Sequence, residues 1–219
     1  MAEAETAVGV FTTDRELIIR SWDRWLEEAT GIAEGDACGR PLVELFPEIE
    51  QHGLLPRLKR VVETGAVEVL APAFHRHLIA CSPRQPSAHF KHMQQHVTIS
   101  PLRGANEVAG AIVTLEDVTA RLDRERDLAA QLRSSDEAVR LRAAQALADE
   151  GGRPALLGEV LGDRSWRVRR AASGGLAQAE DDSAVELLIS AIRDGHRDPG
   201  RLNAAVTALV RSSRDVLPR

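Results

Sequence analysis

Glu116-Asp117-Val118-Thr119 joins two segments of opposite character. The residues before it, Val108-Ala-Gly-Ala-Ile-Val-Thr-Leu115, form an apolar run rich in Val and Ile, which is typical of a strand. Residues 119–133 lack Gly and Pro and are dense in Arg, Asp, Glu, Leu and Ala, which predicts a helix. Asp117 and Thr119 both have side chains that can accept hydrogen bonds from the free N–H groups at a helix start. We therefore predict a rigid strand-to-helix corner between two domains.

The composition of the 219-residue chain is that of a globular protein with one or two domains, with 43% apolar and 28% charged residues. Aromatic residues make up 3%, which argues against stacking platforms for nucleic acid, and the net charge of −5 predicts no general attraction to nucleic acid or anionic membranes. No apolar run approaches the roughly 20 residues that span a bilayer, and the acidic N-terminus does not resemble a secretory signal. The two cysteines, Cys38 and Cys81, form no CxxC pair. We expect a cytoplasmic protein with reduced thiols and with neither a nucleic-acid nor a membrane partner.

The residues before the corner predict a mixed α and β domain. Two apolar runs, residues 7–12 and 16–22, are separated by three polar residues, which reads as a hairpin. Asp23 is placed to cap a short helix that stops at Gly31. A longer helix is expected from about residue 48 to residue 64, before another glycine.

Two further strands are expected between that helix and the corner. Residues 67–81 alternate, and His75 and His77 share one parity with the small apolar residues, although Pro72 interrupts pairing. Residues 92–102 alternate as well, with one apolar face and one face of polar and histidine side chains. In the first of these strands, the histidines are expected to point toward the interior.

These features resemble a PAS sensory domain over residues 5–117. Trp22-Asp23 stands where PAS domains commonly have Trp-Asn, and residues 30–48 are similar to the family's "TG…G…LFPE" run. Glu116-Asp117-Val118-Thr119 resembles the Asp-x-Thr exit of the PAS sheet. The resemblance implies an antiparallel five-stranded sheet with helices, a pocket that senses a small ligand or cofactor, and a signalling helix at residues 118–133. It also makes Asp117 and Thr119 candidate signal-relay residues.

Six of the seven histidines fall in this half of the chain. Imidazole is a common ligand, and some PAS domains bind haem, so His75, His77 and His52 are candidate haem ligands. The alternative is that these histidines lie on a solvated face or are hydrogen-bonded in place. Flavin is disfavoured, because neither cysteine lies in the Asn-Cys-Arg-Phe-Leu-Gln run of the light-sensing relatives. No metal site is predicted, and no phosphate loop, GxSxG or HExxH motif occurs, so we expect no enzymatic activity.

The residues after the corner helix repeat themselves. Residues 139–147 and 168–176 superpose at an offset of 29 residues, residues 202–209 form a weaker third copy, and further apolar helical runs lie between the copies. Helix pairs at such a period predict an all-α solenoid. Over residues 134–215 the pattern resembles short HEAT-like repeats, including those of the phycobilin-lyase (PBS-lyase) type.

HEAT-like repeats imply a protein partner. The candidate partner-binding residues are Trp166, the one large aromatic residue here, and two arginines of the first helices, Arg140 and Arg169. The alternatives are a solvated basic face and a tryptophan that caps a repeat junction.

The leading hypothesis is a non-enzymatic sensory adaptor in signal transduction, with a PAS pocket that senses a ligand and repeats that bind a protein. One alternative is a constitutive scaffold that forms a homodimer through the PAS half or the linker helix. The other is a tetrapyrrole-handling, lyase-like protein, which the repeat resemblance alone suggests.

Overall fold

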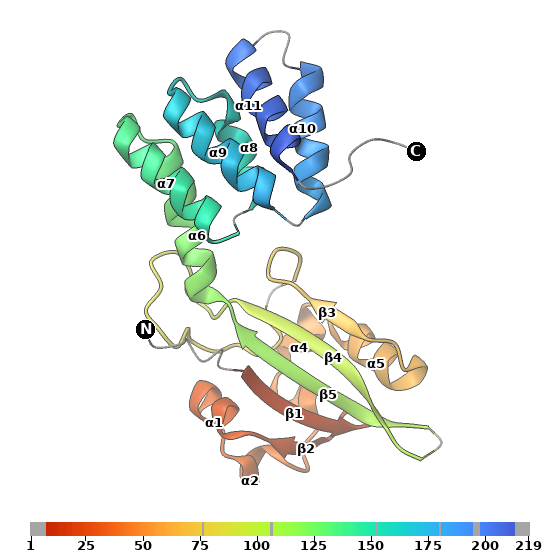
Figure 1. The fold of residues 1–219 in the computed structure, drawn as a ribbon. Helices are drawn as coiled ribbons and strands as arrows, with labels where there is room; N and C mark the ends of the chain where they lie inside the picture. Colours follow the sequence, from red (N-terminus) through yellow and green to blue (C-terminus); the bar gives the residue numbers. More distant parts are fainter. Residues whose placement is uncertain are drawn as a thin grey trace. The chain divides into compact units, whose positions relative to one another are not determined.

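The computed structural model describes residues 8–75, 77–105, 107–151, 153–179, 181–194 and 198–212. The chain forms two compact units, Met1–Asp123 and Arg124–Arg219 (Figure 1). Helix α6 (Thr119–Leu132) begins in the first unit and ends in the second. The ends of the predicted domains, residues 5–7 and 213–215, lie outside the described residues. The predicted boundaries after residues 117 and 133 stay predictions.

The first unit is built on a five-stranded antiparallel sheet with the strand order β2-β1-β5-β4-β3. The strands are β1 (Val8–Asp14), β2 (Ile19–Trp22), β3 (Glu68–Leu70), β4 (Gln95–Arg103) and β5 (Val108–Asp117). The predicted hairpin is confirmed as β1 and β2. Because β5 pairs with both β1 and β4, the strand that leads into the corner lies in the middle of the sheet.

Short helices cover one face of this sheet (Figure 1). They are α1 (Arg24–Thr30), α2 (Glu34–Ala37), α3 (Leu42–Leu45), α4 (Glu48–Gln51) and α5 (Leu55–Thr64). As predicted, the Asp23 side chain accepts a hydrogen bond from the N–H of Leu26, and Gly31 ends α1 with a φ of 73°. The core includes an aromatic cluster in which the ring of Trp22 lies 5.5 Å from Phe11 and 5.9 Å from Phe46.

The single long helix predicted at residues 48–64 is wrong, because the structure has two helices there. Helix α4 ends at Gln51, Gly53 has a φ of 69°, and α5 then begins with Pro56 in its first turn. A left-handed backbone at Gly53 cannot continue a right-handed helix. His52 therefore caps the C-terminal end of α4 instead of opening a long helix.

The long strand predicted at residues 67–81 is also wrong, because β3 ends at Leu70. The carbonyl of Ala71 accepts hydrogen bonds from the N–H groups of Phe74 and His75, which makes a turn next to Pro72. The expected parity is reversed as well, since Val69 is 47% exposed and its two neighbours in the strand are buried. His75 and His77 consequently lie on no strand face.

The described residues between β3 and β4, 71–75 and 77–94, form an irregular segment whose position depends on Gln95. The Gln95 side chain is 2% exposed. Its carbonyl oxygen accepts from the N–H groups of Leu78 (3.0 Å) and Ile79 (3.3 Å), and its amide donates to the carbonyl of Ile79 (2.6 Å). One buried amide side chain thus replaces the missing strand pairing.

The second unit consists of helices in two layers, which confirms the predicted all-α solenoid. Helix α9 packs against both α7 and α11, while α8 packs against α10. The helices after α6 are α7 (Glu137–Asp149), α8 (Pro154–Glu159), the 3-10 turn η1 (Val160–Gly162), α9 (Trp166–Gln178), α10 (Asp182–Asp194) and α11 (Pro199–Arg211). The three sequence copies lie in α7, α9 and α11, as predicted.

The C-terminal half of α6 belongs to the core of this second unit. Leu128 and Leu132 are 7% and 3% exposed and lie in the same apolar cluster as the repeat helices. The end of α6 therefore packs on the repeats. Within the described ranges, no helix is long and apolar enough to cross a membrane.

Replacing Gln95 with leucine should destabilise the first unit, because the substitution leaves the backbone groups of Leu78 and Ile79 buried without partners. We expect a loss of ~3 kcal/mol in the free energy of unfolding. Urea unfolding followed by circular dichroism measures it. The control is Gln94→Leu, whose side chain bonds only the carbonyl of His92. Equal midpoints for the two variants would contradict this role of Gln95.

Candidate functional site

The structure brings two of the three predicted haem ligands together. The rings of His52 and His77 lie 5.2 Å apart between centroids, and His77 lies 5.3 Å from His92. His75 is elsewhere, because its Nδ1 lies 3.2 Å from the N–H of Ala71 in the turn after β3. The cluster of His52, His77 and His92 thus joins the end of α4 to both ends of the irregular segment.

In the histidine cluster, His52 and His77 are half-buried and His92 is exposed. Nδ1 of His52 is buried and has no hydrogen-bond partner in the structure. Among the residues that the structure describes, no group of three or more His, Cys, Asp or Glu is arranged to hold a metal ion. A single imidazole is enough to ligate a haem iron, and the Nδ1 of His52 is a donor of that type.

The corner at the start of α6 is fixed by hydrogen bonds on both sides. The Asp117 carboxylate accepts from the N–H of Thr119 at 2.9 Å, as predicted for a residue at a helix start. Thr119 does something else: its buried hydroxyl accepts from the N–H of Gln94 at 2.8 Å, just before β4. The N–H of Val118 donates to the carbonyl of Gln94 at 2.9 Å. The hydroxyl therefore ties the helix to the sheet and does not cap it.

The irregular segment contacts this corner directly. The N–H of Arg84 donates to the Asp117 carboxylate at 3.4 Å, and the hydroxyl of Ser87 lies 2.8 Å from the carboxylate of Asp123 in the first turns of α6. The irregular segment thus contributes His77 and His92 to the histidine cluster and also contacts the start of the helix. The sequence predicted these two features separately and gave no sign of their connection.

Both cysteine thiols are protonated at neutral pH. Burial raises the pKa of Cys81 to about 11, although the hydrogen bond from Gln95 acts in the opposite direction. Burial and the nearby charge of Glu34 also raise the pKa of Cys38. Neither environment forms the thiolate that a reactive cysteine needs.

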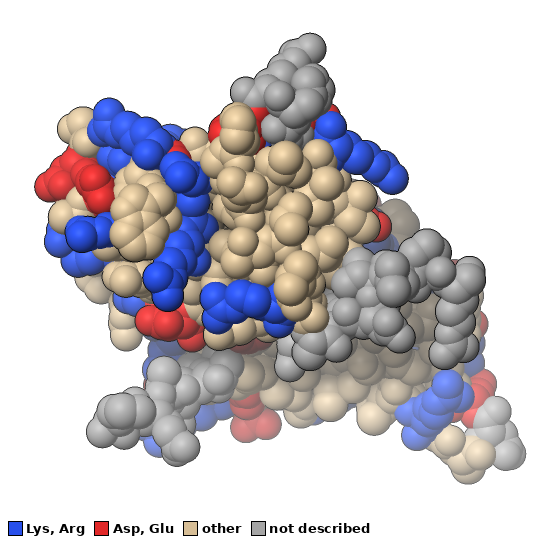
Figure 2. All heavy atoms as spheres, turned by 45° about the horizontal axis from the view of Figure 1, so that its top comes forward, with Lys and Arg blue, Asp and Glu red and all other residues tan. Residues whose placement is uncertain are grey.

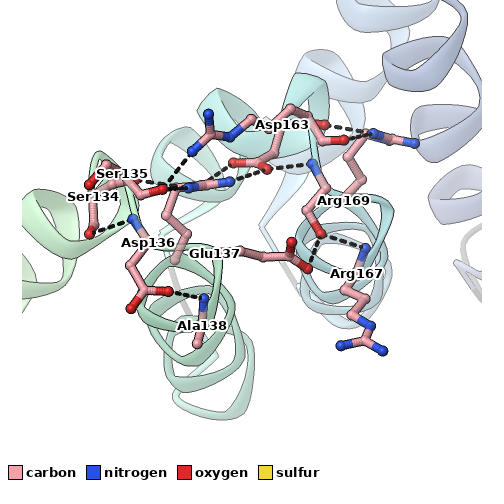
Figure 3. A network of polar contacts seen from close by, with 11 residues as sticks. Ser134, Ser135, Asp136, Glu137, Ala138, Asp163, Arg167 and Arg169 are labelled. Atoms are coloured by element: carbon pink, nitrogen blue, oxygen red, sulfur yellow. Dashed lines mark hydrogen bonds and ion pairs between the residues drawn. The ribbon is translucent and has the colours of Figure 1, made fainter.

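In the repeat unit, Arg140 is a buried residue. Figure 3 shows the network of polar contacts to which its partners Ser134, Ser135 and Asp163 belong. Arg140 is 4% exposed, and its Nε and Nη2 donate to the carboxylate of Asp163 at 2.7 and 3.1 Å. Its Nη1 donates to the carbonyls of Ser134 and Ser135 at 2.9 and 3.1 Å. Arg140 therefore joins the loops before α7 and α9 and is not an exposed partner-binding residue.

Arg169 repeats this arrangement 29 residues later. Its Nη1 donates to the carbonyl of Asp163 at 2.6 Å, as Arg140 does to Ser134. Burial alone would raise the pKa of Asp163, but the hydrogen bonds from Arg140 and from the N–H of Ser165 outweigh it and hold that pKa below its usual value. The repeat offset in the sequence was the signal that could have assigned both arginines to repeat junctions.

Trp166, the third predicted partner-binding residue, is 58% exposed at the start of α9. It borders two hollows, one of about 530 Å³ between α7 and α9 and one of about 410 Å³ between α9 and α11. We call the two hollows together the α9 groove. Its aromatic and charged lining residues are Trp166, Arg167, Arg169, Arg170, Arg211 and Asp149. Figure 2 shows such Lys and Arg side chains gathered beside an uncharged area.

Comparisons with known proteins agree with this architecture. Residues 5–123 match the sequence profile of the PAS fold, and residues 125–210 match that of HEAT repeats. PAS folds and HEAT repeats are generally not catalytic; HEAT repeats generally mediate protein interactions, and PAS domains dimerise. No similar protein was found among curated sequences.

Solved structures similar to the first unit are PAS or sensory domains. A PAS domain from Colwellia psychrerythraea is 20% identical over 52% of this chain and 88% of its own, with a TM-score of 0.39. A sensory box sensor histidine kinase from Vibrio cholerae is 14% identical over 50% and 79%, with a TM-score of 0.40. The PAS domain of the Cronobacter turicensis RpfR quorum-sensing receptor, in complex with BDSF, is 17% identical over 53% and 98%, with a TM-score of 0.36.

Replacing Arg140 with methionine should destabilise the repeat unit, because it leaves the buried Asp163 carboxylate uncompensated. We expect the midpoint of thermal unfolding to fall by roughly 10 °C at pH 7. Arg133→Met is the matched control, since Arg133 forms an exposed pair with Glu159 at 3.0 Å and should change the midpoint little.

The fall in the thermal unfolding midpoint of Arg140→Met should depend on pH. Because the pKa of Asp163 is lowered in the folded state, its pairing stabilises the fold above its unfolded pKa of about 3.9. That contribution disappears as the pH falls through the folded pKa, so Arg140→Met should approach the wild-type midpoint between pH 5 and pH 2. A constant difference across this range would contradict the assignment.

Proposed function

This chain belongs to the PAS-fold family, and from that premise we propose that it is a non-enzymatic sensory adaptor in signal transduction. The first unit senses a small ligand or cofactor, and the HEAT repeats bind a protein partner. The observation that carries the proposal is that described residues of the irregular segment contact both the histidine cluster and the start of α6. A ligand that moved His77 would disturb the contacts of Arg84 and Ser87 with the corner.

Helix α6 supplies the second half of the proposed relay. Its first residue, Thr119, is held at the end of the sheet, while Leu128 and Leu132 pack in the repeat core. A shift of the corner would therefore act on the packing of the first repeat without any further element between them. Asp117 and Thr119 are the proposed relay residues, because they hold the corner to the irregular segment and to β4.

Haem is the cofactor to test first, with His77 or His52 as the axial ligand. Haemin added to the full-length protein should then give a Soret band shifted from that of free haemin, and one of His77→Ala and His52→Ala should remove the shift. His75→Ala tests the remaining predicted ligand. The control is His96→Ala, because His96 faces Glu116 away from the cluster. A spectrum that equals that of free haemin would reject haem and leave a colourless ligand.

The relay predicts that Asp117→Ala and Thr119→Val weaken partner binding without unfolding either unit. Asp117→Ala removes a hydrogen bond at the helix start, worth about 1 kcal/mol, and Thr119→Val leaves the N–H of Gln94 without its partner. Hydrogen exchange should rise in the first turn of α6. Thr119→Ser keeps the hydroxyl and serves as the control. Unchanged affinity for a protein or peptide partner in both variants would reject the relay.

The alternative function is a constitutive scaffold. The aromatic cluster of Phe11, Trp22 and Phe46 in the core of the first unit favours this alternative, because it occupies space that a ligand would need. In this case the first unit, or α6, would form a homodimer. Light scattering with and without haemin distinguishes the sensory adaptor from the constitutive scaffold, because a scaffold should have the same mass in both conditions.

A further inference from the structure

We propose that the α9 groove binds an acidic segment of a partner protein, which inserts an apolar side chain beside Trp166. This inference rests on the proposed function, because it names the partner chemistry that the HEAT repeats would recognise. Three independent features of the groove support it: unpaired positive charge, an exposed aromatic anchor, and a helix glycine with open space above it.

The groove concentrates positive charge in an acidic protein. Four arginines and one aspartate, Asp149, are the charged residues that line it, whereas the whole chain carries a net charge of −5. Within the described part of the chain, Arg167, Arg170 and Arg211 have no carboxylate at ion-pair distance. Three arginines outside the groove in the same unit are instead paired on the surface: Arg124 with Glu150, Arg133 with Glu159 and Arg153 with Glu125. Guanidinium groups left unpaired on one face are suited to carboxylates of a partner.

Trp166 provides the apolar contact at the centre of this charge. Its ring is 58% exposed, and together with Arg170 and Arg211 it borders both hollows. The guanidinium of Arg167 lies 6.0 Å from the ring centroid, so the indole face has a cation at its side. Tryptophan and arginine are the residue types that most often dominate the binding energy of protein interfaces.

Gly174, in the interior of α9, leaves the floor of the larger hollow open. A Cβ at Gly174 would meet nothing within 4 Å, whereas a Cβ at the adjacent Gly175 would lie 2.7 Å from the Cβ of Ala148. Close packing of α7 and α9 therefore explains Gly175 but not Gly174. Glycine is unfavourable in a helix interior, so its presence where nothing crowds it is consistent with a ligand that approaches the backbone.

The lining favours a peptide over nucleic acid as the occupant. Single-stranded nucleic acid binds on rows of aromatic side chains along a basic channel, and Trp166 is the one aromatic residue in the groove. Asp149 would also repel phosphates at the edge of the larger hollow. A segment that combines Asp or Glu with an aliphatic or aromatic side chain matches both parts of the surface.

The test selects binders from a phage-displayed library of random peptides on the full-length protein. We expect the selected peptides to be acidic with an apolar residue. A fluorescein-labelled copy should bind with a Kd that rises about thirtyfold in Trp166→Ala and about tenfold in Arg170→Gln. Gly174→Leu should block binding although leucine favours the helix, so this variant keeps the test valid if Trp166→Ala unfolds.

Arg193→Gln is the matched control, because it removes the same charge from an exposed position on α10 outside the groove, and it should leave the Kd unchanged. Peptides that bind all variants equally would overturn the groove and leave the proposed adaptor intact. A library without any binder would overturn the groove and also count against the partner-binding half of the proposed function. Displacement of the peptide by oligo(dT) would overturn the inference in favour of nucleic acid.

Discussion

The hydrogen bonds of Gln94 and Gln95 fix two distant segments of the first unit at one point. The backbone of Gln94 bonds Val118 and the hydroxyl of Thr119, while the side chain of Gln95 bonds the irregular segment. Buried polar groups must be satisfied, so neither segment can move without a cost to the other. This dipeptide connects the irregular segment to the start of the helix that leaves the domain.

The second unit separates its arginines into two roles. Arg140 is buried between repeats, where its pairing with Asp163 and its bonds to loop carbonyls leave it nothing to offer a partner. Arg170 and Arg211 stand on the groove without a carboxylate at ion-pair distance in the described chain. The buried ion pair holds neighbouring repeats together, whereas exposed arginines without a paired carboxylate are available to bind a partner. Buried and exposed arginines both occur on helices that look equally basic in the sequence, so the sequence alone does not distinguish them.

Where sequence patterns were local, they predicted the structure. The hairpin, the Asp23 cap, the stop at Gly31 and the repeat helices all follow from signals within a few residues or from a regular period. The two failures have equally local causes. Gly53 breaks the expected long helix, and the turn at Pro72 ends the expected strand. In both places the pattern of apolar residues continues along the sequence although the helix or strand has ended.

The sequence by itself determined the order of a mixed α and β domain, a corner and paired repeat helices, because periodicity and capping report which faces are buried and where elements end. The assignment of these parts to the PAS and HEAT families came from the resemblance of their motifs. Only the tertiary structure decided which side chains meet. The contact of His52 with His77, and that of Arg211 with the surface around Trp166, depend on how separate elements pack. Such neighbours are set by three-dimensional packing between residues far apart in the chain, and no period along the chain encodes them.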